Sequence, residues 1–178
     1  MNPIQIRDKH FTPFISEEKI QEEVARVASE INRDLAGEEP LLVSVLNGAF
    51  MFTADLMRNI TVPHEVSFVK VASYEGTEST GTIKEMIGLN ENIEGRSIII
   101  VEDIVDTGFT MNYLVNALKA RNPKEIRIAT LLFKPEKLKV ELNIDYVAMS
   151  IPNDFIVGYG LDYDGQGRNY RDIYVVAD

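Results

Sequence analysis

Residues 98–110 read Ile-Ile-Ile-Val-Glu-Asp-Ile-Val-Asp-Thr-Gly-Phe-Thr. The apolar run from Ser97 to Val101 does not alternate with polar residues, which is typical of a strand covered on both faces, as in a parallel sheet. A buried helix segment gives the same pattern, but the β-branched residues and the preceding Gly95 favour a strand. A polar turn follows, and the apolar residues from Thr110 to Ala120 keep helical spacing. We therefore predict a strand, a turn and a helix in succession.

Strands alternate with helices on both sides of this unit. Ser16 followed by two glutamates predicts a helix start, and apolar residues keep helical spacing from Ile20 until Gly37. Residues 74–82, rich in Gly, Ser, Thr and Glu, predict a mobile loop. Further elements are expected as a helix at residues 49–59 and as strands at residues 41–46, 64–73, 84–89, 127–133, 146–151, 155–157 and 173–176. This order predicts an α/β fold, with a mostly parallel twisted sheet flanked by helices.

Composition limits the class of protein. With 178 residues, 45% of them apolar, the chain fits a single domain spanning residues 1–178. It has no cysteine, which excludes disulfides and thiolate metal sites, and the cytoplasm is the expected location. No apolar run approaches the roughly 20 residues needed to cross a bilayer, so no membrane association is expected. The net charge of −10 argues against nucleic-acid binding, which depends on Lys and Arg.

The turn after the central strand carries groups that bind phosphate. Gly108 permits a tight backbone path, and the hydroxyls of Thr107 and Thr110 can surround a phosphate together with the N–H groups of the helix start. Acids beside a phosphate repel it unless they contact something neutral or cationic. Glu102 and Asp103 therefore indicate ribose hydroxyls or Mg²⁺, and we predict a sugar phosphate as the ligand.

Two other interpretations apply to the same turn. A bare Asp-Thr-Gly sequence is more often a solvated acidic turn with a threonine cap, and only the whole of residues 98–110 favours a phosphate site. A metal-dependent phosphotransferase with an aspartate nucleophile also places acids after a buried strand. Its aspartates stand one residue apart, whereas Asp103 and Asp106 are separated by two residues, so that alternative fits poorly.

Over most of its length the chain resembles the hypoxanthine-guanine phosphoribosyltransferase family, with the matching segments in the family's order. They are Leu46-Asn47-Gly48 with Ala54-Asp55-Leu56, Ser73-Tyr74 with Ser79-Thr80-Gly81, residues 101–110, Phe133-Lys134-Pro135, residues 151–163 and Tyr170-Arg171-Asp172. The resemblance implies the type I phosphoribosyltransferase fold, with a small hood over the base site. The hood would comprise the N-terminal segment and about residues 151–178. The resemblance also implies a homodimer or homotetramer.

The same resemblance implies a reaction and a role for each site residue. The 5-phosphoribosyl group of phosphoribosyl pyrophosphate would pass to N9 of hypoxanthine or guanine, giving IMP or GMP and pyrophosphate in purine salvage. Asp106 would be the general base, Lys134 would donate to the 6-oxo group, and Phe155 would stack on the purine. The other implied contacts are Glu102, Asp103, Asp106, Thr107, Gly108, Phe109 and Thr110 with the ribose and 5′-phosphate, Ile156 and Asp162 at the purine, Asn47, Gly48 and Arg171 with pyrophosphate, Ser73 and Tyr74 as the lid, and Glu102, Asp103 and Asp162 with Mg²⁺.

Taken one at a time, several of these residues would be assigned no function. A lysine at a strand end is usually solvated, a phenylalanine in an apolar segment is usually core, and an aspartate in a turn is usually a solvated acid. Arg171 is preferred to Arg168 because of its Tyr-Arg-Asp context, while His10 and His64 lie in no motif and are assigned no role.

Two alternative functions stay open. One is a regulatory protein on the same scaffold that binds nucleotides and a nucleic acid, against which the net charge of −10 counts. The other is a sister transferase acting on xanthine, adenine or a pyrimidine. Lys134 as a donor favours a 6-oxo acceptor over a 6-amino group.

Overall fold

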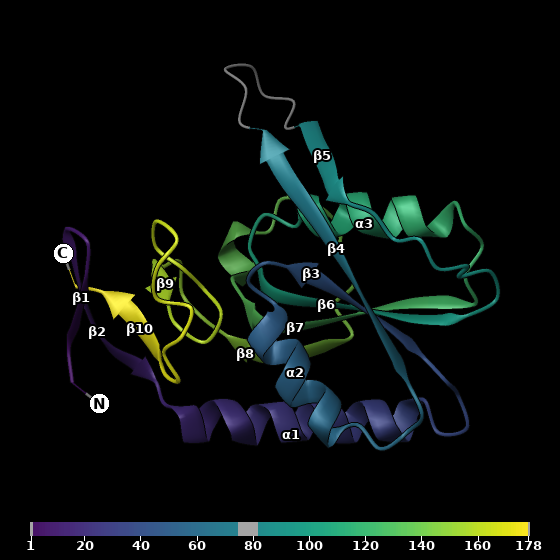
Figure 1. Ribbon diagram of the computed structural model, residues 1–178, viewed down its shortest axis with the longest axis horizontal. Helices are drawn as coiled ribbons and strands as arrows, with labels where there is room; N and C mark the ends of the chain where they lie inside the picture. The colour runs from purple at the N-terminus through teal and green to yellow at the C-terminus, as the bar shows by residue number, and fades with distance from the viewer. Residues whose placement is uncertain (1, 75–81, 178) are drawn as a thin grey trace.

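A computed structural model describes residues 2–74 and 82–177, and at residues 73, 74 and 82–86 it describes the backbone alone. Its larger sheet has six strands in the order β5, β4, β3, β6, β7, β8 (Figure 1). Their bounds are β3 Leu41–Leu46, β4 Glu65–Tyr74, β5 Thr82–Ile87, β6 Ser97–Val105, β7 Glu125–Phe133 and β8 Tyr146–Ser150. The pairings of β4 with β3, β3 with β6, β6 with β7 and β7 with β8 are all parallel. Among these described strands, only β5 pairs with its neighbour, β4, in an antiparallel direction. The predicted mostly parallel sheet is confirmed.

Helices cover both faces of this sheet. They are α1 Glu17–Asp34, α2 Phe50–Asn59 and α3 Phe109–Lys119, and a short 3₁₀ helix covers Pro135–Lys137. Ile99 and Val101 of β6 pack in the core cluster that contains α1 and α2, whereas Ile98 and Ile100 pack in the cluster that contains α3. Successive side chains of a strand point to opposite faces, so an unbroken apolar run buries both. Each isoleucine buried in this way contributes roughly 1.5–3 kcal/mol.

The first helix shows why its sequence fits this position. The Ser16 hydroxyl accepts a hydrogen bond from the Lys19 N–H at 3.2 Å, and two acids follow in the first turn. Such a cap contributes about 1 kcal/mol. Ile20, Val24, Val27 and Ile31 are buried along one side, as the spacing predicts, and the helix ends at Asp34, before Gly37 with its φ of 82°.

A second, smaller sheet joins the two ends of the chain. Its order is β1, β2, β10, β9, with bounds β1 Ile4–Ile6, β2 Lys9–Ile15, β10 Ile173–Val176 and β9 Ile156–Val157. All its pairings are antiparallel, and β10 lies between the N-terminal hairpin and β9. The sequence did not predict the two N-terminal strands. It placed the N-terminal segment beside residues 151–178, and the pairing of β2 with β10 agrees with that placement.

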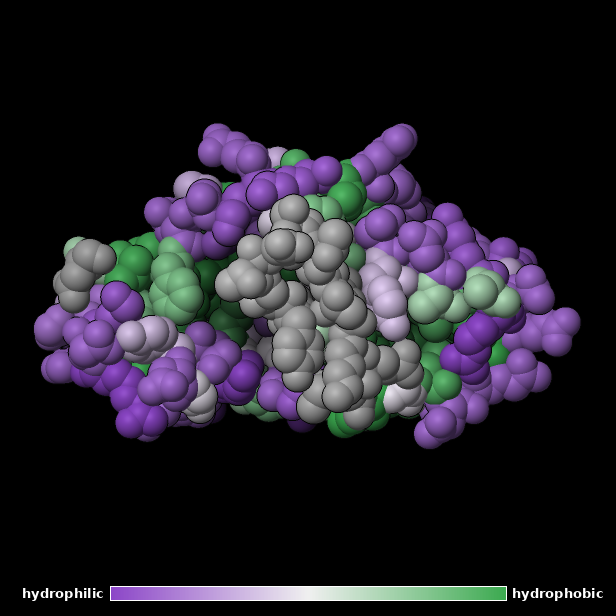
Figure 2. Space-filling view, turned by 90° about the horizontal axis from the view of Figure 1, so that it is seen from above, coloured by the Kyte–Doolittle hydropathy of each residue, from purple (hydrophilic) through white to green (hydrophobic). Residues whose placement is uncertain are grey.

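The small sheet lies at one end of the larger one, and both chain ends are there (Figure 1). Seen from above, the surface is mostly hydrophilic, with hydrophobic side chains in scattered groups toward both ends (Figure 2). None of the helices in the described residues has the length and apolar character needed to span a bilayer.

Candidate active site

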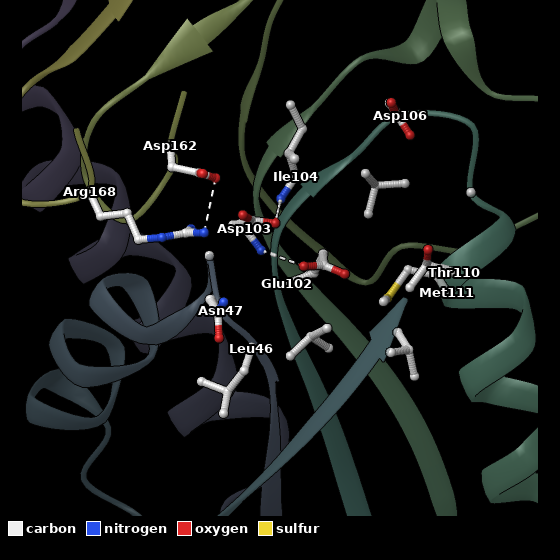
Figure 3. Close-up of a pocket in the computed structure, with 15 residues that line it drawn as sticks. Leu46, Asn47, Glu102, Asp103, Ile104, Asp106, Thr110, Met111, Asp162 and Arg168 are labelled. Atoms are coloured by element: carbon white, nitrogen blue, oxygen red, sulfur yellow. Dashed lines mark hydrogen bonds and ion pairs between the residues drawn. The ribbon is translucent and has the colours of Figure 1, made fainter. Parts of the chain in front are cut away.

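A cleft of about 320 Å³ lies at the carboxyl ends of β3 and β6 (Figure 3). In parallel α/β sheets this edge is where ligands bind. The cleft's lining comprises Val45, Leu46, Asn47, Gly48, Val71, Glu102, Asp103, Ile104, Val105, Asp106, Gly108, Thr110, Met111, Asp162 and Arg168. Three separate loops therefore meet around one space, together with the start of α3.

Two adjacent carboxylates form the floor of this cleft. The Glu102 side chain is buried, with 7% of the residue exposed, and its Oε1 accepts from the Asp103 N–H at 3.0 Å. Asp103 Oδ1 accepts from the Ile104 N–H at 2.7 Å. Burial, and then the neighbouring Asp103 charge, raises the pKa of Glu102 well above its ordinary value, while burial also raises the pKa of Asp103. The pair is thus short of positive partners in the protein itself.

Oxygen donors of this kind suit Mg²⁺. No group of three or more His, Cys, Asp or Glu side chains in residues 2–74 and 82–177 is arranged to hold an ion. Asp162, the third predicted ligand, is instead paired with Arg168, with 3.0 Å between Oδ1 and Nη2. The described residues therefore offer Mg²⁺ two adjacent carboxylates, those of Glu102 and Asp103.

Gly48 lies directly against one of these acids. A Cβ atom at this position would stand 1.6 Å from Asp103 Oδ2. The preceding peptide bond, between Leu46 and Asn47, is cis. Only a residue without a side chain can occupy this place while Asp103 keeps its position.

The turn before α3 has a backbone that only glycine adopts easily. Gly108 is the N-cap of α3 with a φ of 85°, and a Cβ there would also lie 2.8 Å from Val140 Cγ2. No side chain of the described residues caps this helix end. The first N–H groups of α3, at its positive end, are thus available to an anion.

Asp106 differs from the two buried acids. Its side chain is 46% exposed and faces the cleft on the side opposite Asp162 and Arg168 (Figure 3). Its Oδ1 accepts from the Thr107 N–H at 2.5 Å, and its Oδ2 lies 3.5 Å from Lys137 Nζ. A carboxylate with this exposure can exchange protons with a ligand.

Beyond Asp106 lies the residue predicted to bind the base. Lys134, only 8% exposed, donates through Nζ to the Asp154 carbonyl oxygen at 2.6 Å. Burial, and then the charge of Lys137, lowers the pKa of Lys134. Phe155, which follows Asp154, is exposed and stands edge-on to Tyr163, with 5.7 Å between ring centroids.

These features agree with what is known of other proteins. Residues 16–164 match the family of phosphoribosyl transferase domains. A hypoxanthine-guanine phosphoribosyltransferase of Streptococcus mutans is 44% identical over 163 residues, which cover 91% of this chain and 89% of that protein. The chain belongs to the hypoxanthine-guanine phosphoribosyltransferase family.

Other relatives of this chain differ in length. A bifunctional TilS/HprT protein of Listeria monocytogenes is 42% identical over 157 residues, or 88% of this chain, but the chain spans only 24% of that protein. Among solved structures, a hypoxanthine-guanine phosphoribosyltransferase of Bacillus anthracis has a TM-score of 0.88 and 41% identity, covering 94% of this chain and 97% of that one. The fold is therefore that of type I phosphoribosyltransferases.

Eight of the sixteen predicted site residues line the cleft. The predicted residues that line it are Asn47, Gly48, Glu102, Asp103, Asp106, Gly108, Thr110 and Asp162. Thr107 and Phe109 belong to the same turn without lining the cleft, and the Phe109 ring is half exposed. Ile156 is buried in β9, where it pairs with Val175.

One predicted site residue lies away from the cleft in this structure. Arg171, preferred from the sequence, is 79% exposed and pairs with Glu17 at 2.9 Å, away from the cleft. Arg168 lines the cleft instead and pairs with Asp162. The bridge between Tyr163 and Gln166 folds the chain back after Asp162, which brings Arg168 beside that aspartate.

The contact of Lys137 with Asp106 was not predicted either, because a lysine that follows Pro-Glu is usually a solvated surface charge. Ser73 and Tyr74 end β4. Their side chains, and residues 75–81 of the predicted loop, lie outside the described part of the chain.

Proposed function

We propose that this chain is a Mg²⁺-dependent phosphoribosyltransferase that joins hypoxanthine or guanine to the ribose phosphate of phosphoribosyl pyrophosphate, forming IMP or GMP. One observation carries the proposal. The buried Glu102 and its half-buried neighbour Asp103 lie shortly before a glycine-capped helix start, and Asp106, which follows them, lies near Lys134. A ribose phosphate offers hydroxyls to the acids and an anion to the helix.

Substrate binding divides among three groups of residues. The 5′-phosphate accepts hydrogen bonds from the N–H groups of the turn from Asp106 to Thr110, at the positive end of α3. The ribose hydroxyls face Glu102 and Asp103. The pyrophosphate takes the end of the cleft lined by Asn47, Gly48, Asp162 and Arg168, with Arg168 in the place first assigned to Arg171.

The base takes the other end of the cleft. Lys134 donates to the 6-oxo group, and its bond to the Asp154 carbonyl fixes the direction of its Nζ. Phe155 offers an exposed ring next to Asp154, supported by Tyr163. Because a 6-amino group would meet Lys134 donor to donor, adenine should be rejected by as much as about 10⁴-fold.

The charges that develop during the reaction determine the role that we propose for each group. Breaking the bond from C1 to pyrophosphate develops positive charge on the sugar and negative charge on the leaving group. Arg168 stabilises the leaving group, and Asp106 accepts the proton from N7 of the purine. Mg²⁺, held by Glu102 and Asp103, would supply a Lewis acid that neutralises the phosphates.

A single assay tests this proposal. Purified protein, phosphoribosyl pyrophosphate and Mg²⁺ are incubated separately with hypoxanthine, guanine, xanthine, adenine and uracil, and nucleotide formation is followed. We expect turnover with the first two bases. Turnover with only xanthine, adenine or uracil would support a sister transferase, and no turnover with any base would refute the proposal.

Three wider features belong to the same proposal. We infer a single domain over residues 1–178, a homodimer or homotetramer, and a cytoplasmic location. Pairing of the N-terminal strands with β10 supports the first, since it ties the two ends of the chain into one small sheet. Family membership supports the other two.

A further inference from the structure

Tyr159 has an unusual backbone for its residue type. Its φ is 48°, in the left-handed region that side chains other than Asn, Asp and Gly seldom adopt. Such a conformation costs roughly 1–3 kcal/mol and persists only where the surroundings fix it. Tyr159 is 5% exposed, and its hydroxyl donates to Asp55 Oδ2 at 2.5 Å. The surroundings that fix it therefore include a buried bond to a carboxylate.

Asp55 belongs to the helix that begins at the pyrophosphate end of the cleft. It lies in α2, which starts two residues after Gly48, and the Thr53 N–H donates to the Ala49 carbonyl at 2.8 Å within the first turn. Gln21 of α1 donates to the same Asp55 oxygen at 2.8 Å. Burial, and then Asp55, raises the pKa of Tyr159, so the hydroxyl keeps its proton.

The next residue reaches the cleft directly. Gly160 packs on the backbone of Gly48, since a Cβ at Gly160 would lie 2.3 Å from the Gly48 carbonyl oxygen. Arg168 Nη1 donates to the Gly160 carbonyl at 2.7 Å, and the Gly160 N–H donates to the Arg168 carbonyl at 3.0 Å. Arg168 Nη2 pairs with Asp162 at 3.0 Å (Figure 3).

These contacts form one connected path from Tyr159 to the cleft. We propose that the Tyr159 hydroxyl, bonded to Asp55, is a positioning group that holds Gly160 on Gly48 and thereby sets Arg168 to receive the pyrophosphate group. This inference rests on the proposed function, because it assigns pyrophosphate to that end of the cleft. Tyr159 touches no substrate in this proposal and acts through Arg168 and Gly48.

The test replaces the hydroxyl and leaves the ring. Tyr159→Phe should raise the KM for phosphoribosyl pyrophosphate about tenfold, the loss expected for one hydrogen bond to a charged group. The KM for hypoxanthine should stay within about twofold, because Lys134 and Phe155 lie outside the path. A merely structural defect would move both constants, or kcat, together.

Tyr146→Phe is the matched control. Tyr146 is 2% exposed, and its hydroxyl donates to Asp34 Oδ2 at 3.0 Å, far along the sheet from Arg168. The variant thus loses the same kind of bond to a carboxylate, together with the hydrogen bond that the hydroxyl accepts from Arg127 Nη1 at 2.9 Å. Its KM values should match the parent within about twofold, while its Tm falls about as far as that of Tyr159→Phe.

Asp55→Asn and the double variant complete the series. Asn can still accept from Tyr159, so Asp55→Asn should raise the KM for phosphoribosyl pyrophosphate less than Tyr159→Phe does. Tyr159→Phe/Asp55→Asn should be no worse than Tyr159→Phe alone. If Tyr159→Phe fails to fold, Asp55→Asn decides the question by the same split of the two KM values.

Binding of inorganic pyrophosphate with Mg²⁺, measured by calorimetry, gives a readout that does not need turnover. It should weaken about tenfold in Tyr159→Phe and not in Tyr146→Phe. Equal effects of the two variants, or equal rises in both KM values, would overturn the inference while the parent's activity stands. A parent that formed no nucleotide yet showed the calorimetric split would instead overturn only the proposed function.

Discussion

Glu102, Asp103 and Asp106 are three carboxylates within five residues, yet their surroundings assign them different work. Glu102 is buried and Asp103 half-buried, and desolvation raises the pKa of both, which suits them to partners that bring positive charge or hydroxyls. Asp106 is 46% exposed and contacts Lys137, so it stays within reach of a proton on the ligand. Since all three are carboxylates, their positions in the turn, and not their residue types, assign ligand binding to Glu102 and Asp103 and proton transfer to Asp106.

Asp106→Asn tests the role of general base. Asn keeps the size of the side chain and can still accept from the Thr107 N–H, so the turn should be preserved. We expect kcat to fall about 10²–10⁴-fold, the usual contribution of general base catalysis. Binding of phosphoribosyl pyrophosphate, measured by calorimetry, should change less than about twofold. Unchanged turnover would remove Asp106 from the proton transfer.

Glu102→Gln should stabilise the protein while harming its activity. The folded-state pKa of Glu102 is raised, so its contribution to stability is present below the unfolded value of 4.5 and is lost as pH rises through the folded pKa. At pH about 7.5 the glutamate therefore costs stability, and Gln removes that cost of about 1 kcal/mol, raising Tm by roughly 2–4 °C.

The pH dependence provides the control for that prediction. The difference in Tm between Glu102→Gln and the parent should shrink as pH falls below 4.5, where the parent carboxyl becomes protonated in both the folded and the unfolded state. A Tm gain that is equal at both pH values would mean that charge burial is not its cause.

Lys134→Ala tests base selection. The variant loses the donor to the 6-oxo group, so the ratio of hypoxanthine to adenine kcat/KM should fall at least about tenfold, through loss of hypoxanthine use. A charged neighbour, Lys137, provides a matched control, since Lys137→Ala removes a cation that contacts Asp106 rather than Asp154. A ratio equal to that of the parent in Lys134→Ala would exclude the base-reading role.

At the scale of elements, the site depends on close contact between loops. The loop between β3 and α2 meets the end of β6 where Gly48 touches Asp103, and it meets the segment after β9 where Gly160 touches Gly48. Both contacts are made by backbone against a neighbour, with no room for a methyl group. The cleft is therefore a product of three loops held at fixed spacing.

Gly48→Ala should separate folding from function at this contact. The added methyl meets the end of the Asp103 side chain, which can move, so we expect Tm to fall by only about 2–4 °C, equivalent to roughly 1 kcal/mol. Displacing that carboxylate should lower kcat/KM for phosphoribosyl pyrophosphate at least about tenfold. A variant with normal kinetics would show that Asp103 need not hold its place.

The elements show what the sequence predicts well and what it does not. The helical spacing of α1 was predicted within a residue or two of its bounds, and the start of β6 was predicted at Ser97, but β6 continues four residues past the predicted end, to Val105, through residues that were assigned to a polar turn. The strands β1 and β2 were missed because β1 is an edge strand of only three residues, and because β2 takes one of its partners, β10, from the far end of the chain. Arg168 was missed for a related reason, since its position depends on a fold-back at residues 163–166 that spacing alone does not reveal.

At the scale of the whole molecule, an acidic protein must bind a highly anionic substrate. The net charge is −10, so overall electrostatics oppose the approach of phosphoribosyl pyrophosphate. What favours binding is local: the start of α3, Arg168 and the backbone of the β3–α2 loop. Two of the acids counted in that net charge, Glu102 and Asp103, lie at the floor of the cleft, so we expect a cation to accompany the substrate.

Ligand-induced stabilisation tests that balance without measuring turnover. A ligand at 100 times its Kd stabilises the folded state by about 2.7 kcal/mol, which for a chain of this size raises Tm by roughly 5–10 °C. We expect this rise with phosphoribosyl pyrophosphate and Mg²⁺ together, and only a small one with phosphoribosyl pyrophosphate in chelator. In Glu102→Gln, which keeps the fold but halves the charge of the acidic pair, the rise caused by adding Mg²⁺ to phosphoribosyl pyrophosphate should shrink markedly. An equal rise with and without chelator would mean that the cleft binds its substrate without a metal, and the two carboxylates would then have to act on ribose hydroxyls alone.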